Sequence, residues 1–118
     1  MSLNFEKWHG NGNDFVIINS VEQNIKLKKS FIKKISDRNK GIGFDQLIVI
    51  TLPTKYNYDF FVRFYNSDSS EAGMCLNGIR CASSYIWKNS LAPIKKIFFK
   101  TKYIDIKCSP GNNNDVSV

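Results

Sequence analysis

The sequence predicts an α+β domain that combines short strands with one buried helix. Two observations favour this class. Short β-rich segments recur along the chain between turns rich in glycine and asparagine, and an amphipathic helical pattern follows the longest polar loop. With 118 residues and 42% hydrophobic content, the chain has the size and composition of one folded domain.

The first segments predict a β-hairpin. Residues 3–8 alternate as a strand does, and residues 9–14 place two glycines and two asparagines in a turn. Residues 15–18 are apolar and rich in β-branched side chains, which is typical of a buried strand.

The pattern then becomes helical over residues 27–38, with Ser30 as the expected N-cap. A second glycine-bearing turn at 41–46 leads into a β-rich segment at 47–51. Residues 58–65 alternate as a further strand, which runs directly into the longest polar loop.

The main helix is predicted over residues 76–87. The small and apolar positions that share one of its faces are Ile79, Ala82, Ser83 and Ile86.

The start of this helix is the candidate active site. The amides of Leu76, Asn77 and Gly78 would have no intrahelical acceptor, so they and the helix dipole favour an anion there. Cys75 directly precedes them, and the same position favours its thiolate. We therefore expect Cys75 to act as a base or nucleophile beside a carboxylate site.

The last part of the chain is β-prone. Residues 97–108 fit one long strand or two short ones, because no glycine marks a turn. Residues 109–114 give a strong turn signal, and a new alternation starts at 116–118. We expect the chain to stop within a hairpin.

Composition excludes several classes of function. The three cysteines contain no CxxC pair, so we expect neither a disulfide framework nor a metal site, but reduced thiols in the cytoplasm. Fourteen of the seventeen basic residues are lysines spread along the chain, so the formal charge of +7 does not predict a nucleic-acid partner. No apolar run reaches the ~20 residues of a membrane span, so we expect no membrane partner.

Three polar turns carry the amide side chains of Asn13, Gln46 and Asn66. If the sheet brings these turns together, amides surround Cys75 and suit a zwitterionic ligand. The alternative for each turn is that its side chain bonds its own backbone. The only histidine, His9, is expected to be structural, and the loop carboxylates of Asp68 and Glu71 are expected to act as caps.

Three segments carry a family resemblance: HGNGNDF at 9–15, GIGFDQ at 41–46 and NSDSSEAGMCLNGIRC at 66–81. In order and spacing they resemble the N-terminal domain of the diaminopimelate epimerase family. The resemblance implies a mixed or antiparallel sheet rolled around a central helix. Residues 1–118 would be the N-terminal one of two pseudo-symmetric halves, with the C-terminal domain absent.

The resemblance also implies an isomerase of lysine and peptidoglycan biosynthesis. Such an enzyme converts LL- to meso-diaminopimelate with two cysteines on opposite faces of the α-carbon and no cofactor. Cys75 matches one of the pair. The resemblance further implies that the substrate would be contacted by Asn13, Gln46, Asn66 and Asn77, and that its carboxylate would be held by the amides of Leu76 and Asn77. Cys81 matches a structural position of the motif.

Two consequences follow for this chain. The second cysteine would come from the absent domain, so the chain alone is expected not to epimerise. The family forms homodimers, which implies the same association here.

Two positions depart from the family pattern. Leu76 stands where the family has glycine, and Ser69 stands where it usually has glycine. Two alternatives stay open, and the bulky Leu76 side chain beside the carboxylate site motivates the first of them. One is a non-catalytic remnant or module that binds an amino acid or a partner surface. The other is a related cysteine-based racemase, such as a relative of proline racemase.

Overall fold

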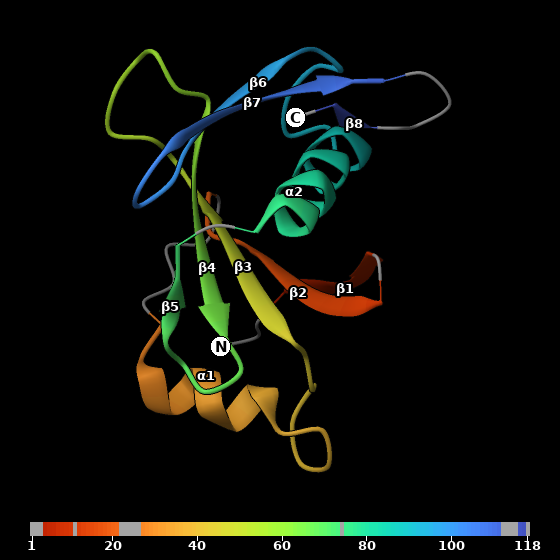
Figure 1. Ribbon diagram of the computed structural model, residues 1–118, viewed down its shortest axis with the longest axis vertical. Helices are drawn as coiled ribbons and strands as arrows, with labels where there is room; N and C mark the ends of the chain where they lie inside the picture. Colours follow the sequence, from red (N-terminus) through yellow and green to blue (C-terminus); the bar gives the residue numbers. More distant parts are fainter. Residues whose placement is uncertain (1–3, 11, 22–26, 74, 112–115, 118) are drawn as a thin grey trace.

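The computed structural model describes residues 4–10, 12–21, 27–73, 75–111 and 116–117. These residues form an α+β fold in which a curled mixed sheet encloses one helix and carries another on its outer face (Figure 1). The elements in chain order are β1 (Phe5–Gly10), β2 (Asn13–Asn19), α1 (Lys29–Ser36), β3 (Gln46–Thr51), β4 (Phe60–Asn66), β5 (Glu71–Ala72), α2 (Leu76–Lys88), β6 (Ile97–Lys100), β7 (Asp105–Pro110) and β8 (Val116–Ser117).

The sheet has the strand order β1-β2-β3-β4-β6-β7-β8, with β5 paired to β4. Two neighbouring pairs, β2 with β3 and β4 with β6, run parallel, and the other pairs are antiparallel. Both parallel connections contain a helix, α1 in the first and α2 in the second. This is the usual solution for joining parallel strands. The predicted mixed sheet is confirmed.

The two faces of the sheet pack against different helices, because successive side chains of a strand point to opposite faces. On one face, residues such as Phe15, Ile48 and Phe64 form a fully buried cluster with Ile79 and Ile86 of α2. On the other face, the intervening residues Val16, Ile18, Leu47 and Val49 pack with Ile32 and Ile35 of α1.

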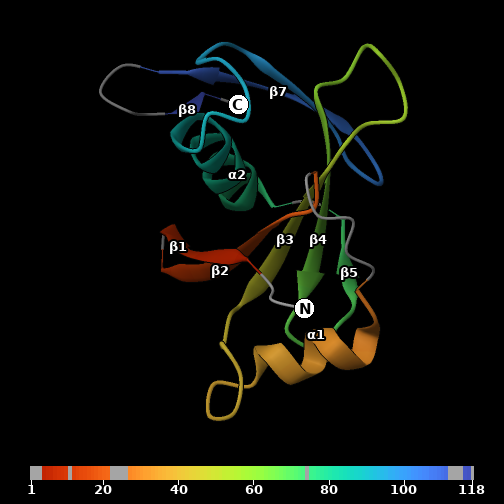
Figure 2. The same ribbon diagram turned by 180° about the vertical axis from the view of Figure 1, so that it is seen from behind.

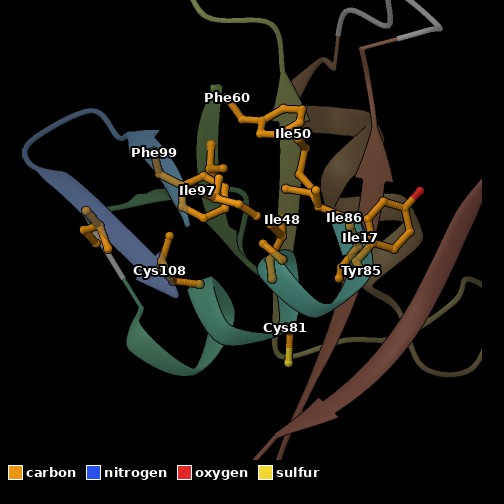
Figure 3. Packing of buried hydrophobic residues seen from close by; sticks show 14 of the residues in the cluster. Ile17, Ile48, Ile50, Phe60, Cys81, Tyr85, Ile86, Ile97, Phe99 and Cys108 are labelled. Carbon is orange, nitrogen blue, oxygen red and sulfur yellow. The ribbon is translucent and has the colours of Figure 1, made fainter. Parts of the chain in front are cut away.

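Helix α2 lies inside the curl of the sheet. In both ribbon views it sits between the β1–β2 hairpin and the β6–β7 hairpin, while α1 lies at the opposite end of the molecule (Figures 1 and 2). Figure 3 shows Tyr85 and Ile86 of α2 among sheet residues that include Ile17 and Ile48. The predicted helix and its apolar face are confirmed, since Ile79, Ala82, Ser83 and Ile86 are all buried.

The N-terminal hairpin is tighter than the sequence predicted. Gly10 pairs with Asn13, so the strands extend into the expected turn region 9–14 and the turn is shorter than predicted. Gly12 has a φ of 85°, which glycine adopts without steric cost. Residue 3 of the expected first strand lies outside the described residues.

Other boundaries also differ. Helix α1 is shorter than the expected 27–38, and the prediction of Ser30 as N-cap is wrong. Lys28 occupies that position with no side-chain cap, and Ser30 lies inside the first turn. The short strand β5 was not predicted, because two residues are too few to show an alternation.

The C-terminal β-prone segment is two strands, β6 and β7. The turn between them needs no glycine, because the Thr101 hydroxyl donates to the carbonyl of Ile104 and accepts its amide.

Candidate active site at the start of the central helix

Cys75 is the N-cap residue of α2, between β5 and the helix. Its backbone is extended (φ −141°, ψ 113°), and its carbonyl accepts the first intrahelical bond from Ile79 N at 2.9 Å. Its Sγ accepts a hydrogen bond from Gly78 N at 3.3 Å. Cys75 is half-buried and packs against the apolar cluster beneath α2. A thiol group therefore replaces the usual hydroxyl or carboxylate cap at the positive end of the helix.

The expectation that three amides face outward at this helix start needs one correction. The Gly78 amide is engaged by the Cys75 sulfur and is not available to a ligand. Leu76 and Asn77 are the first two residues of α2, and their amides precede the first intrahelical bond. The Leu76 side chain is 48% exposed, so it takes no part in the core.

Gly78 allows the helix start to approach the sheet closely. A Cβ atom at this position would lie 2.9 Å from Cε1 of Phe64, a buried residue of β4. The first turn of α2 therefore rests on Phe64, two residues before Asn66. This contact explains the glycine at position 78 by packing.

The three predicted amide residues share the face of the sheet that packs against α2. Asn13, Gln46 and Asn66 stand two residues before Phe15, two before Ile48 and two after Phe64, so each has the same orientation as that core residue. Asn66 is the direct register partner of Gln46, and Gln46 is the partner of Phe15. The structure thus brings the three strand ends together on the side where α2 begins.

Gln46 and Asn66 are in direct contact. Gln46 Nε2 donates to Asn66 Oδ1 at 3.2 Å, and Asn66 Nδ2 donates to Ser70 Oγ at 3.1 Å. The Asn66 side chain therefore bonds two other side chains, so the alternative in which each turn amide bonds its own backbone is wrong for Asn66. Gln46 Oε1 is buried and has no hydrogen-bond partner in the described part of the chain.

A carboxylate cluster lies one residue away on the opposite face. Arg38 donates to both oxygens of Asp14, at 2.9 and 3.0 Å, and to Asp45 Oδ1 at 3.1 Å. The amides of Asp14 and Asp45 each donate to the other's carboxylate at 2.9 Å. The Arg38 guanidinium holds the pKa of Asp14 well below its usual range. Sequence reasoning missed this cluster, although Asp14 and Asp45 lie within two of the motifs.

The other polar residues singled out in the sequence have structural positions. His9 lies in β1, paired with Asp14, rather than in a turn. Asp68 accepts the amide of Ser70 at 2.9 Å and so closes the loop as expected. Glu71 forms ion pairs with Arg63 and Lys102 at 3.7 and 3.8 Å, rather than capping the loop.

Cys75 differs from the other two thiols, although all three are free. Cys81 and Cys108 are 7% and 0% exposed, and burial raises the pKa of both. Among the described residues, no group of three potential ligands could hold a metal ion. No helix in the described ranges is long and apolar enough to cross a bilayer.

The fold class is shared with solved structures of low sequence identity. Methylitaconate-delta-isomerase superposes with a TM-score of 0.67 at 12% identity, over 100% of this chain and 63% of that one. A phenazine biosynthesis protein of the PhzF family from Bacillus anthracis gives 0.66 at 16% identity, over 97% and 37% of the two chains. Both establish the class, a domain with a curled mixed sheet around a central helix.

Sequence comparison identifies the particular family within this class. The diaminopimelate epimerase family model matches residues 5–116, and the chain belongs to that family. Diaminopimelate epimerase of Blochmanniella pennsylvanica is 42% identical over 116 residues, and that of Acinetobacter baylyi is 39% identical over 118. The matches cover 98% and 100% of this chain and 42% of each relative.

Proposed function

We propose that this chain supplies one catalytic half of a diaminopimelate epimerase, with Cys75 as one of its two acid–base groups. The observation that carries this proposal is the Cys75 thiol at the N-terminus of α2, whose first turn rests on Phe64, a residue of the sheet face that also carries the three amide residues. Residues 1–118 are then the N-terminal domain, and the active site is completed by a second domain.

The start of α2 provides a binding position for the negatively charged substrate carboxylate and a base for the α-proton. The substrate carboxylate binds at the first turn of α2, where the backbone amides of Leu76 and Asn77 lie at the positive end of the helix dipole. The Cys75 sulfur, stabilised as an anion by the Gly78 amide, removes the α-proton and becomes a thiol. The electron pair left on the α-carbon is delocalised into the bound carboxylate, whose developing charge the same dipole stabilises.

Inversion requires a second proton donor on the opposite face of the α-carbon. Cys81 and Cys108 are buried among apolar residues, so neither serves as this donor. More than half of each matched relative lies outside the segment aligned here, and we propose that the second thiol comes from that part. A thiol there donates its proton to the carbanion, and the two cysteines exchange protonation states in each turnover.

A non-catalytic binding module is the second candidate, and Leu76 is the observation that favours it. The half-exposed side chain stands beside Cys75 at the carboxylate site, where it narrows the space for substrate. It leaves the backbone donor intact, so catalysis remains the first proposal.

The three free thiols suit a reducing compartment, and we infer that the protein acts in the cytoplasm as a homodimer.

The test is incorporation of solvent deuterium at the α-carbon of LL-diaminopimelate. The chain is assayed alone and with the separately expressed remainder of the Blochmanniella pennsylvanica relative, after binding of the two parts has been verified. We expect exchange only in the mixture, with loss on Cys75→Ala and retention on Cys81→Ala, which removes a buried thiol of the same helix.

Two results would count against this proposal. Exchange that survives Cys75→Ala would exclude Cys75 as the acid–base group. No exchange in a bound mixture, restored by Leu76→Gly, would establish the binding module for the natural sequence.

A further inference from the structure

The loop between β4 and β5 contains a connected row of hydrogen bonds that ends at Gln46. The Ser70 hydroxyl bonds Asp68 Oδ1, Asn66 Nδ2 bonds Ser70 Oγ at 3.1 Å, and Gln46 Nε2 bonds Asn66 Oδ1 at 3.2 Å. The row joins an exposed carboxylate to the half-buried Gln46, whose Oε1 atom is buried, on the face of the sheet that packs against α2.

The direction of the row is determined at Asp68. An ionised carboxylate only accepts, and Asp68 accepts both the amide and the hydroxyl of Ser70. These hydrogen bonds hold the pKa of Asp68 below its usual range, so the group is ionised at neutral pH. The single hydroxyl proton of Ser70 is therefore committed to Asp68, and its oxygen faces Asn66 as an acceptor.

The same reasoning fixes the orientation of the side-chain amides of Asn66 and Gln46. Asn66 must direct its NH₂ group at Ser70, which turns its Oδ1 toward Gln46. Gln46 must then direct its own NH₂ group at Asn66, which leaves Oε1 at the end of the row. This is the oxygen that is buried without a partner in the described part of the structure.

An unpaired buried acceptor lowers the stability of a folded chain, so it calls for an explanation. Its chemistry specifies the missing partner. A carbonyl oxygen accepts from N–H or ammonium groups and repels a carboxylate. Had the row run the other way, Gln46 would present NH₂ and favour an oxyanion.

We propose that Asp68 and Ser70 are positioning residues that orient Asn66 and Gln46, so that Gln46 Oε1 accepts a hydrogen bond from an ammonium group of the substrate. The identity of that substrate as an amino acid rests on the proposed function. The orientation of the two amides stands on the hydrogen-bond geometry alone.

The first test needs no catalysis. Side-chain amide resonances of Asn66 and Gln46 are recorded by ¹H–¹⁵N NMR for the wild-type chain, Ser70→Ala, Ser70→Thr and Ser67→Ala. Ser67 is an exposed serine of the same loop and serves as the matched control. We expect Ser70→Ala to shift both side-chain amides, Ser70→Thr to restore them and Ser67→Ala to leave them unchanged.

The second test uses the deuterium-exchange mixture, with pimelate, which has the two carboxylates but no amine, as competitor. We expect Ser70→Ala to raise KM for diaminopimelate about fivefold or more, with a smaller change in kcat, and to reduce the preference over pimelate. Ser70→Thr should recover both values.

The outcomes separate the two proposals. Unchanged amide resonances and KM in Ser70→Ala would overturn the positioning role. Loss of kcat alone, with KM and the preference over pimelate unchanged, would also overturn it. Absence of exchange in the wild-type mixture would count against the proposed function, while the NMR response would still support the oriented row.

Discussion

Two polar clusters lie at the same strand ends, in positions one residue apart, and they differ in charge and in hydrogen-bond pairing. Asp14 and Asp45 face the α1 side, where Arg38 and reciprocal backbone bonds pair their carboxylates. Asn13 and Gln46 are their sequence neighbours and face the α2 side, where the groups are neutral amides and one buried oxygen has no partner among the residues that the structure describes. The period of two in a strand separates the clusters.

The difference indicates a division of labour between the two faces. The charged cluster joins the start of β2 to the start of β3 and has strong, mutually satisfied partners, which is typical of a structural site. The amide cluster leaves the Gln46 Oε1 acceptor without a partner among the described residues, on the sheet face that packs against α2, which is typical of a site that awaits a ligand. Loss of the first should therefore reduce stability, and loss of the second should reduce function.

The largest effect on stability is expected from Arg38→Met. Asp14 is 9% exposed and would lose its bidentate partner, so the thermal unfolding midpoint should fall by several degrees at pH 7. The folded-state pKa of Asp14 lies below its unfolded value of about 4, so its contribution is present above that pH and is lost as pH falls toward the folded pKa. The wild-type and variant midpoints should therefore converge below about pH 4.

Calorimetry of both proteins from pH 7 to pH 2 measures this convergence. Lys34→Met removes the same charge from the exposed side of α1 and should shift the midpoint little at any pH. Two curves that stay parallel down to pH 2 would contradict the role assigned to Asp14.

Gln46→Met, on the amide side, is expected to change stability in the opposite direction or not at all. The change removes the unpaired oxygen along with the bond to Asn66, so the free energy of unfolding should stay equal or rise by up to about 1 kcal/mol. Deuterium exchange in the two-domain mixture should fall about tenfold or more. Urea denaturation measures the first quantity and the exchange assay the second.

Ile48→Met is the control for Gln46→Met, because it changes a fully buried residue of the same strand and face. It should cost less than about 1.5 kcal/mol and leave exchange largely intact. If Gln46→Met destabilises the chain more than Ile48→Met does, the amide cluster is structural and the comparison between the faces fails.

Much of the functional face could be predicted from sequence, because its signals are local. The helical spacing after Cys75 and the alternation in β4 lie within single segments, and both predictions are confirmed. The amide residues were found because each stands at a strand end next to a polar turn. Their roles toward a substrate stay predictions.

The Arg38 cluster could not be predicted in the same way. Its three members lie 24 and 7 residues apart, and only the parallel pairing of β2 with β3 brings the carboxylates together. Hydrogen-bond direction in the Asp68 row was equally hidden, because it depends on which atoms face each other. The sequence indicated which side chains are polar but not which of them already have hydrogen-bond partners.

The smallest effect is expected from Ser69→Gly in the hairpin that carries Asn66. Ser69 has a φ of 75°, a left-handed conformation that costs a non-glycine residue about 1–2 kcal/mol. This conformation gives a physical reason for the glycine usual in the family. Glycine also gains entropy in the unfolded chain, about 0.4–1 kcal/mol, so the net stabilisation should be about 0.5–1 kcal/mol.

Ser67→Gly supplies the matched control, because residue 67 of the same loop has no positive φ. It should lower stability by about 0.5–1 kcal/mol, since it adds unfolded-state entropy and relieves no strain. Urea denaturation of the two variants and the wild type gives both values. If Ser69→Gly is destabilising, packing of the buried Ser69 side chain outweighs its backbone strain. The hairpin would then depend on serine itself, and the departure from the family pattern would be an adaptation of this chain.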